Sequence, residues 1–232
     1  MKPTCAINQL GRVAFPTALA LQNRLIAERS EPDGIDCLLL LEHPHTYTLG
    51  SAGHDSYILM SADERERRGV EVYRTDRGGD VTYHGAGQIV AYPIIELADF
   101  QRGTVRGDVV GYVRKLEQVL IDTLTDYRLV GKRIAGLVGV WVETPRGEEK
   151  IAAIGVRVNV RGVTKHGFAL NANTDLSYFD GIIPCGIHDK GVTSLAVLLG
   201  HPVDEAEVRA RLIAHFGAVF ACAMVEVTLA LE

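Results

Sequence analysis

The sequence predicts an α+β fold, in which a mixed or antiparallel sheet is flanked by helices. Segments with strand patterns outnumber helical segments, and several follow one another directly along the chain. The chain has neither the GxGxxG pattern nor the Walker A loop, two marks of nucleotide-binding α/β folds. Its 232 residues show no linker, repeat or low-complexity tract, so one domain is expected over residues 1–232.

Strands are expected where apolar residues alternate or run continuously. The run 35–41 (IDCLLLL) is apolar almost throughout, as in buried strands, and Cys37 within it is expected to be core filler. The segment 144–149 (TPRGEE) predicts a hairpin turn. The expected strands are 5–13, 35–41, 70–75, 88–95, 129–134, 138–144, 149–160, 164–172 and 225–230.

Helices are expected at four places with start signals or helical spacing of apolar residues. Pro16 suits the first turn of a helix over 15–29, because a missing N–H costs nothing there. Ser61 and Glu64 form a capping-box pattern, and Gly69 ends that short helix. A long amphipathic helix is expected over 108–128 and a last helix over 204–219, with Asp204 and Glu207 in its capping positions.

Charge and cysteine usage limit the class of protein. The net charge of −5 argues against a nucleic-acid partner, because phosphate binding needs clustered cations. No signal peptide opens the chain, and no apolar run reaches the roughly 18 residues of a membrane span. The four cysteines are far apart and lack metal-ligand spacing, which favours free thiols and a cytoplasmic location.

The stretch from Arg74 to Ile95 (RTDRGGDVTYHGAGQIVAYPII) is the first candidate for a binding site. Its glycines would let the backbone approach a ligand closely, and Arg77 and His84 could hold a polar head group. An ordinary glycine-rich surface loop is the alternative. The density of Gly, Arg, Thr, Tyr and His in this segment favours a binding loop.

Lys150 is the second candidate. In the strand 149–161, alternation places it at the end of an apolar face with Ala152 and Ile154, which we expect to meet the core. The common interpretation is a lysine that snorkels to solvent at the strand end. The alternative is a partly desolvated lysine that points into a pocket.

Cys185, in the turn GIIPCGIH, is a candidate nucleophile. It lies between a proline and a glycine and outside any apolar periodicity, unlike Cys37 and Cys222. Core filler remains the alternative from the residues alone. His43 and His45 have HxH spacing, but no third ligand of suitable type accompanies them, so no metal site is predicted.

Five segments, taken in this order and spacing, resemble one family: LEHPHTYTLG, RGGDVTYHGAGQIVAYPI, EKIAAIGVRV, HGFALNANTDL and IIPCGI. The resemblance is to the octanoyltransferases of lipoate biosynthesis, the octanoyl-[acyl carrier protein]:protein N-octanoyltransferases or lipoyl(octanoyl) transferases. It covers about residues 38–195. The chain departs from it at Ser51, where many members have Arg or Gln. The implied fold is that of the biotin/lipoate protein ligase catalytic domain.

The resemblance also implies roles for single residues. Cys185 matches the acyl-thioester nucleophile, and Lys150 matches the lysine that lowers the pKa of that cysteine. The matching substrate-binding residues are Arg77, Gly78, Gly79, Asp80, Val81, Thr82, Tyr83, His84, Ala153, Ile154, Gly155, Gly167, Phe168 and Ala169.

The implied activity is transfer of an octanoyl group from octanoyl-acyl carrier protein to a lysine, as the first step of endogenous protein lipoylation. The implied acceptors are lipoyl domains of 2-oxoacid dehydrogenase complexes and the glycine cleavage H protein. No cofactor is implied. Basic stretches at 65–77 and 157–165 are candidate docking surfaces for acidic protein substrates. The alternatives are an ATP-dependent lipoate–protein ligase on the same fold, an acyl-thioester hydrolase and a non-catalytic acyl-binding module.

Overall fold

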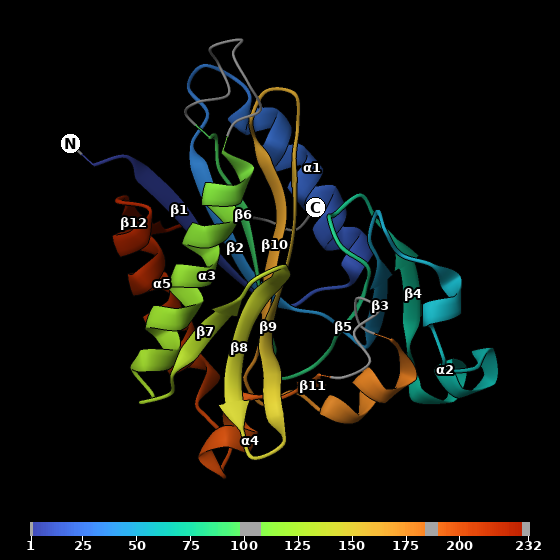
Figure 1. The fold of residues 1–232 in the computed structure, drawn as a ribbon. Helices are drawn as coiled ribbons and strands as arrows, with labels where there is room; N and C mark the ends of the chain where they lie inside the picture. The colour runs from blue at the N-terminus through green and yellow to red at the C-terminus, as the bar shows by residue number, and fades with distance from the viewer. Residues whose placement is uncertain (1, 98–107, 184–189, 229–232) are drawn as a thin grey trace.

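A computed structural model describes residues 2–97, 108–183 and 190–228, and its centre is a large mixed sheet (Figure 1). The sheet has the strand order β12-β1-β2-β6-β10-β9-β8-β7, with β11 paired to β9. The pairs β1–β12, β1–β2 and β11–β9 are parallel, and the remaining pairs are antiparallel. These strands are β1 (Thr4–Arg12), β2 (Asp36–Glu42), β6 (Gln88–Ile94), β7 (Gly131–Ile134), β8 (Leu137–Thr144), β9 (Gly147–Val158), β10 (Thr164–Asn171), β11 (Gly191–Val192) and β12 (Ala223–Glu226).

Helices cover both faces of this sheet, which confirms the predicted α+β fold (Figure 1). Helix α1 (Phe15–Arg29) packs on one face, against the apolar side chains of β2 and β6. Helices α3 (Val109–Thr125) and α5 (Glu205–Val219) lie against each other on the opposite face, over a second buried cluster. We call the two sides of the sheet the α1 face and the α3 face.

A small second sheet stands beside the large one. Its strand order is β4-β3-β5, from β3 (Thr46–Leu49), β4 (Glu71–Arg74) and β5 (Val81–His84). It packs on the 3₁₀ helix η3 (Leu176–Gly181), and helix α2 (Ala62–Arg68) connects two of its elements. The short 3₁₀ helix η1 (Asp55–Tyr57) and helix α4 (Leu195–Leu199) complete the described elements.

The structure confirms three of the predicted capping residues. The side chain of Ser61 accepts a hydrogen bond from the Glu64 N–H, and Gly69 ends α2 in the left-handed conformation, with φ of +64°. Asp204 caps α5 by accepting from the Ala206 N–H. Glu207 does not complete a capping box, because its carboxylate pairs with Arg211 one turn further along. Among the described helices, none is both long and apolar enough to cross a membrane.

Strands β3 and β5 were not predicted. Both are only four residues long, and both carry a threonine or histidine among their buried residues. Such segments lack the length and the clear alternation that identify a strand in sequence. The predicted strand at 225–230 begins earlier, at Ala223, and residues 229–230 lie outside the described part of the chain.

Candidate functional site

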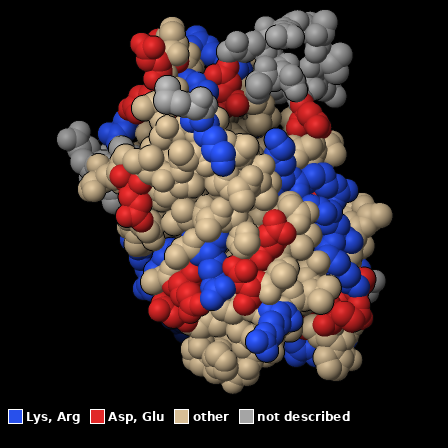
Figure 2. Space-filling view, turned by 90° about the vertical axis from the view of Figure 1, so that its left-hand side faces the viewer, with Lys and Arg blue, Asp and Glu red and all other residues tan. Residues whose placement is uncertain are grey.

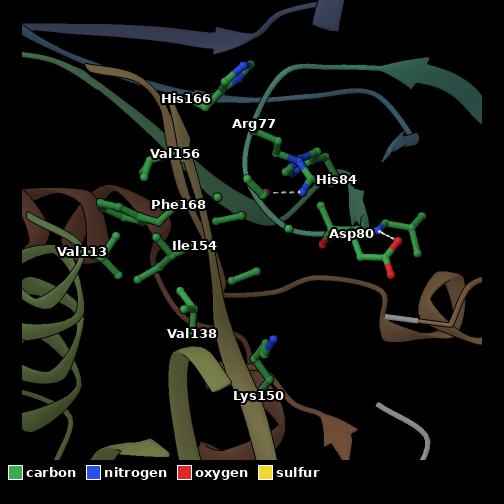
Figure 3. Close-up of a pocket in the computed structure, with 18 of the residues that line it drawn as sticks. Arg77, Asp80, His84, Val113, Val138, Lys150, Ile154, Val156, His166 and Phe168 are labelled. Atoms are coloured by element: carbon green, nitrogen blue, oxygen red, sulfur yellow. Dashed lines mark hydrogen bonds between the residues drawn. The ribbon is translucent and has the colours of Figure 1, made fainter. Parts of the chain in front are cut away.

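A cavity of about 490 Å³ lies where the segment 77–82, strands β9 and β10, the β7–β8 turn and helix α3 meet (Figure 3). It takes residues from both sides of the β9–β10 pair. Figure 3 shows Val113, Val138 and Ile154 on one side of these strands and Arg77, Asp80 and His84 on the other. The cavity therefore connects the two faces of the large sheet at one edge of β9.

Backbone hydrogen bonds hold the segment 75–80 on two sides. Toward β3, Gly50, Ser51 and Ala52 donate their N–H groups to carbonyl oxygens of this segment, at 2.9–3.1 Å. Toward β9, the Gly78 N–H donates to the Val156 carbonyl, at 2.9 Å. The segment thus closes one part of the β9 edge and is fixed in place before any ligand binds.

Arg77 anchors the same segment through its side chain. Its guanidinium is buried and donates to both the carbonyl and the hydroxyl oxygen of Thr48, at 2.6 Å and 3.0 Å, and to the Gly78 carbonyl at 3.0 Å. A guanidinium can serve several acceptors at once because its five N–H donors have fixed directions. Arg77 lines the cavity, and most of the hydrogen bonds of its guanidinium hold the segment 75–80 in position.

Two glycines allow close packing at the strand pair. Gly155 and Gly167 face each other in the β9–β10 register. A Cβ at Gly155 would lie 2.9 Å from the Gly78 carbonyl oxygen, and one at Gly167 would lie 2.1 Å from the Ala91 carbonyl oxygen. Residues with a side chain would therefore push the segment 77–80 away from β9 or separate the strands.

Lys150 lines the cavity because β9 contains a β-bulge directly after it. Trp141 pairs with Lys150, while Val140 pairs with Ala152, so Ile151 is an extra residue in the strand. Ile151 and Ala152 both enter the core on the α3 face, and Lys150 stands on the opposite face with its ammonium 4.7 Å from the centre of the Trp141 ring. The predicted alternation, with Lys150 and Ala152 on one face, is wrong for this reason.

A gap opens between β8 and β9 beyond the bulge. Gly139 precedes Val140 in β8 and has a φ of +122°. The backbone of β8 therefore bends away from β9 beyond the Val140–Ala152 pair. The next backbone contact on this edge of β9 is the bond from Gly78 to Val156. The segment 153–155, between these two contacts, forms the rim of the opening that joins the two faces.

The part of the cavity on the α1 face is closed off from solvent. We call it the inner compartment and define it by Phe15, His84, Tyr92, His166, Gly167 and Ala169, which are all buried. His166 belongs to this side because its φ of +58° breaks the alternation of β10 and turns its ring toward Asp76.

Three buried histidines surround the inner compartment in their neutral form. Burial lowers the pKa of His43 to about 4 and that of His84 to about 3. Burial also lowers the pKa of His166 to about 4, although its bond to Asp76 opposes the shift. His43 donates from Nδ1 to the Val13 carbonyl at 2.6 Å and accepts from the Tyr92 hydroxyl at 2.8 Å.

The tautomer of His84 follows from its neighbour Gln88. The Gln88 amide nitrogen donates to the Tyr83 backbone carbonyl and to the Asn171 side-chain oxygen. The Gln88 side-chain oxygen therefore faces His84 Nδ1, at 2.8 Å, and must accept a hydrogen bond from it. His84 therefore carries its proton on Nδ1, and its Nε2 is left as a hydrogen-bond acceptor beside the cavity.

The part of the cavity on the α3 face is more open. We call it the outer compartment and define it by Val109, Val113, Val138, Ile154, Val156 and Phe168. Val138 is 51% exposed, whereas Phe168 forms a buried floor. The two compartments therefore differ in chemistry as well as depth: histidine, tyrosine and glycine line the inner one, and aliphatic side chains line the outer one.

The structure brings together nearly all of the predicted site residues. Lys150 and the three segments 77–82, 153–155 and 167–169 line the same cavity, with His84. Tyr83 does not: it is fully buried on the other side of β5, stacked on Tyr178 with ring centres 5.0 Å apart. Cys185 lies outside the described residues.

The described residues that flank Cys185 are well anchored. Before it, Ile183 donates to the Tyr57 carbonyl at 2.8 Å, and Ile182 pairs with Ile58. After it, Val192 pairs with Lys150 in the β11–β9 register and lines the cavity. Strand β11, which follows Cys185 in the chain, thus lies directly beside Lys150.

Several lining residues were not predicted from the sequence. Phe15 begins a helix, Val113 lies on a helix face and Val138 lies at a strand start, and each had only a structural role in the sequence analysis. Only His166 had an available signal, because it directly precedes the predicted segment 167–169 in the motif HGFALNANTDL.

The predicted basic stretches are partly neutralised in the structure. On α2, Arg67 pairs with Glu64 and the Arg68 guanidinium lies 3.9 Å from the centre of the Tyr178 ring. Lys165 pairs with Asp76 at 3.2 Å.

Comparison with known proteins identifies the family of the chain. The profile of the lipoyl protein ligase A/B catalytic domain matches residues 15–217. An octanoyltransferase of Chloroflexus aurantiacus is 52% identical over 218 residues, which cover 94% of this chain and 95% of that protein. The chain belongs to the octanoyltransferase family. An octanoyltransferase of Solibacter usitatus is 51% identical over 216 residues, covering 93% of each protein.

Solved structures show the same fold at low identity. A bipartite lipoate protein ligase from Thermoplasma acidophilum superimposes with a TM-score of 0.72 at 19% identity, covering 98% of this chain and 88% of that one. A lipoate-protein ligase A bound with ATP has a TM-score of 0.73 at 17% identity, covering 99% and 90%. A biotin protein ligase from Aquifex aeolicus has a TM-score of 0.52 at 11% identity, covering 93% and 70%.

These comparisons confirm the predicted family, the predicted fold and the enzyme class. The chain is an acyltransferase that transfers octanoyl groups in protein lipoylation. The fold alone is shared with ATP-dependent ligases, so the decision between transferase and ligase rests on the relatives of about 50% identity.

Proposed function

We propose that the chain takes the octanoyl group from the thioester of an acyl carrier protein onto Cys185 and passes it to a lipoyl-domain lysine, with Lys150 as the proton-transfer group. One observation carries this proposal. The bulge at Ile151 removes Lys150 from the core and places it in the cavity, next to the strand that follows the Cys185 turn.

The first half-reaction exchanges one thioester for another. The Cys185 thiolate attacks the donor carbonyl, a C–S bond to Cys185 forms, and the C–S bond to the carrier thiol breaks. The ammonium of Lys150 favours the thiolate at Cys185, since an opposite charge nearby stabilises the ionised form. The departing thiolate takes up a proton, and we assign the donor of this proton to the Lys150 ammonium, which lines the cavity.

The second half-reaction forms the amide. The lysine amine of the acceptor attacks the acyl-Cys185 carbonyl, a C–N bond forms, and the Cys185 sulfur leaves as thiolate. Lys150, neutral after the first half-reaction, accepts the proton that the amine releases. No ATP is required, because an amide is lower in energy than a thioester.

The rim of the cavity offers a hydrogen-bond donor for the developing oxyanion. Val156 turns its carbonyl to the free edge of β9, where Gly78 donates to it. Backbone groups alternate along a strand, so Ile154, two residues earlier, directs its N–H to the same edge. We infer that this N–H faces the tetrahedral oxyanion formed between Lys150 and the segment 77–80.

The inner compartment is the proposed site of the octanoyl chain. Its walls are buried, so an acyl chain placed there leaves water almost completely. Phe15, Tyr92 and Ala169 give it apolar surface, and the neutral histidines lack the charge that would oppose an alkyl chain. Each buried methylene contributes about 0.8 kcal/mol, so the depth of the compartment would set the preferred chain length.

The relatives support the choice of acceptors. The structural neighbour from Thermoplasma acidophilum is described as a bipartite lipoate protein ligase and its E2 lipoyl domain. We propose lipoyl domains of 2-oxoacid dehydrogenase complexes, and the glycine cleavage H protein, as the acceptors here. We place the reaction in the cytoplasm, where the three described cysteines, Cys5, Cys37 and Cys222, would remain the free thiols that they are in the structure.

Intact-protein mass spectrometry tests the thioester. Incubation with octanoyl-carrier protein, without ATP or acceptor, should add one octanoyl group to the wild type. Hydroxylamine should remove it, and Cys185→Ala should never acquire it. Addition of a lipoyl domain should then discharge the adduct onto the acceptor. Absence of an adduct on folded wild-type protein would overturn the proposed intermediate.

The two rival activities give different results in the same experiment. An ATP-dependent ligase would require ATP and would tolerate Cys185→Ser. An acyl-thioester hydrolase would release octanoate at the full rate without an acceptor.

A further inference from the structure

The outer compartment continues into a second cavity along helix α3. This second cavity has a volume of about 210 Å³ and shares five lining residues with the first: Val109, Val113, Gly136, Leu137 and Val138. The two cavities therefore lie side by side and form one groove, which runs from Lys150 past the β7–β8 turn to the outside of α3. The proposed octanoyl site does not use this groove.

A cationic group stands beside the second cavity. Arg114 lines the second cavity, and its guanidinium pairs with the Glu117 carboxylate at 2.7 Å. Arg133 pairs with the same carboxylate oxygen at 2.9 Å. The Glu117 side chain is 1% exposed, whereas those of Arg114 and Arg133 are 49% and 33% exposed. The negative charge thus lies beneath two positive ones, and the group presents a net single positive charge to solvent.

Figure 2 views the side of the molecule that carries α3 and α5, on which Lys and Arg side chains lie among Asp and Glu. Exposed Val110, beside Arg114, adds apolar surface to the second cavity. This cluster was not predicted from the sequence, because its arginines are 19 residues apart and belong to different elements.

We propose that this groove holds the phosphopantetheine arm of the donor carrier protein, with Arg114 and Arg133 placed at its phosphodiester. This inference rests on the proposed function, since it requires a thioester on a carrier. The acyl thioester lies at Lys150, the thiol end of the arm passes Val138 and Ile154, and its geminal dimethyl group reaches the aliphatic side chains of Val109 and Val113 (Figure 3). The arm carries one phosphate, at the end far from sulfur, and Arg114 lines the second cavity, which Lys150 does not line.

Charge-assisted hydrogen bonds from arginine suit a phosphodiester because they are short and directional. The same arrangement separates the two halves of the substrate. The alkyl chain enters the closed inner compartment, and the carrier arm stays in the open outer one, where it can withdraw after thioester exchange without moving the acyl group.

Three small donors test the inference: the octanoyl thioesters of 4′-phosphopantetheine, pantetheine and N-acetylcysteamine. The measurement is kcat/KM for adduct formation by intact mass. In the wild type, the phosphorylated donor should exceed octanoyl-pantetheine by about 10-fold, the scale of one charged hydrogen bond. In Arg114→Gln this ratio should fall to about 2. In this variant Arg133 still pairs with Glu117, so the buried carboxylate keeps one of its two cationic partners.

A second variant keeps the test independent of charge. Val109→Trp should fill the junction of the two cavities and lower kcat/KM for octanoyl-pantetheine about 10-fold more than for octanoyl-N-acetylcysteamine, since the shorter donor ends before Val109. Arg24→Gln, on α1, is the control and should leave both ratios unchanged.

The outcomes separate the two proposals. Adducts from all donors with the wild-type phosphate ratio in Arg114→Gln, or an equal loss for both donors in Val109→Trp, would overturn the inference alone. No adduct from any donor on the wild type would overturn the proposed function, and this inference with it.

Discussion

The inner and outer compartments meet at the same short rim, residues 153–155, yet they are closed in different ways. The inner one is sealed by buried rings and by a segment fixed through Arg77 and several backbone bonds. The outer one is bordered by a turn and by the first turns of α3, and half of the Val138 surface meets solvent. A site that retains one part of a substrate and releases another needs both kinds of wall.

The largest expected effect comes from removing the group between the two compartments. Lys150→Met should lower kcat for octanoyl transfer by roughly 10²–10⁴-fold, the usual contribution of a general acid–base group. The dependence of the adduct rate on pH should also move toward that of an ordinary thiol. Steady-state rates with carrier protein and lipoyl domain check the first effect, and single-turnover mass spectrometry checks the second.

Lys165→Met is the matched control for this variant. Lys165 pairs with Asp76 and does not line the cavity. Equal loss of rate in the two variants would show that Lys150 acts through general surface charge and not at the reacting group.

A second variant breaks the boundary itself. Gly155→Ala would place a Cβ 2.9 Å from the Gly78 carbonyl oxygen, too close for the segment 77–80 to keep its bond to β9. Overpacking of this kind costs about 1–3 kcal/mol. We expect a drop in Tm of several degrees and a loss of selectivity between octanoyl and decanoyl donors, because the wall of the inner compartment moves. Unchanged Tm and selectivity would show that this contact is easily relaxed.

A smaller change reduces the inner compartment only. Ala169→Val adds two methyl groups at a buried position that lines it. The preferred acyl chain should become shorter, and octanoyl should lose about 4-fold relative to hexanoyl for each methylene that no longer fits. Rates of adduct formation with butyryl to decanoyl donors measure this. A uniform loss for all chain lengths would place the acyl chain elsewhere.

The smallest expected effect concerns acid stability. A histidine whose pKa is lower in the folded protein binds protons more readily when unfolded, so the free energy of unfolding falls as pH drops from about 6.5 toward 4. His43, His84 and His166 all act in this direction. His43→Gln should lose stability at pH 7.5 but show a weaker decrease between pH 7.5 and 5. Urea unfolding at both values gives the two differences, and an unchanged decrease would contradict the role of His43.

The sequence was informative wherever local rules decide structure. Capping residues located both ends of α2 and the start of α5, and Pro16 located the start of α1. It failed at Lys150, because strand alternation assumes an unbroken register and the bulge depends on how β8 pairs with β9. It also could not reveal the outer compartment. Val113 and Val138 are ordinary apolar residues whose shared use follows from tertiary packing alone.

The bulge at Ile151 has a consequence for anyone who grafts or redesigns this strand. Lys150 reaches the cavity only because one residue in β9 has no counterpart in β8. Deleting a residue between 150 and 153 would restore a regular ladder and turn the ammonium toward the hydrophobic layer beneath α3. The position of this lysine thus depends on the number of residues in a strand. A transplanted β9 must keep both its partner β8 and its number of residues.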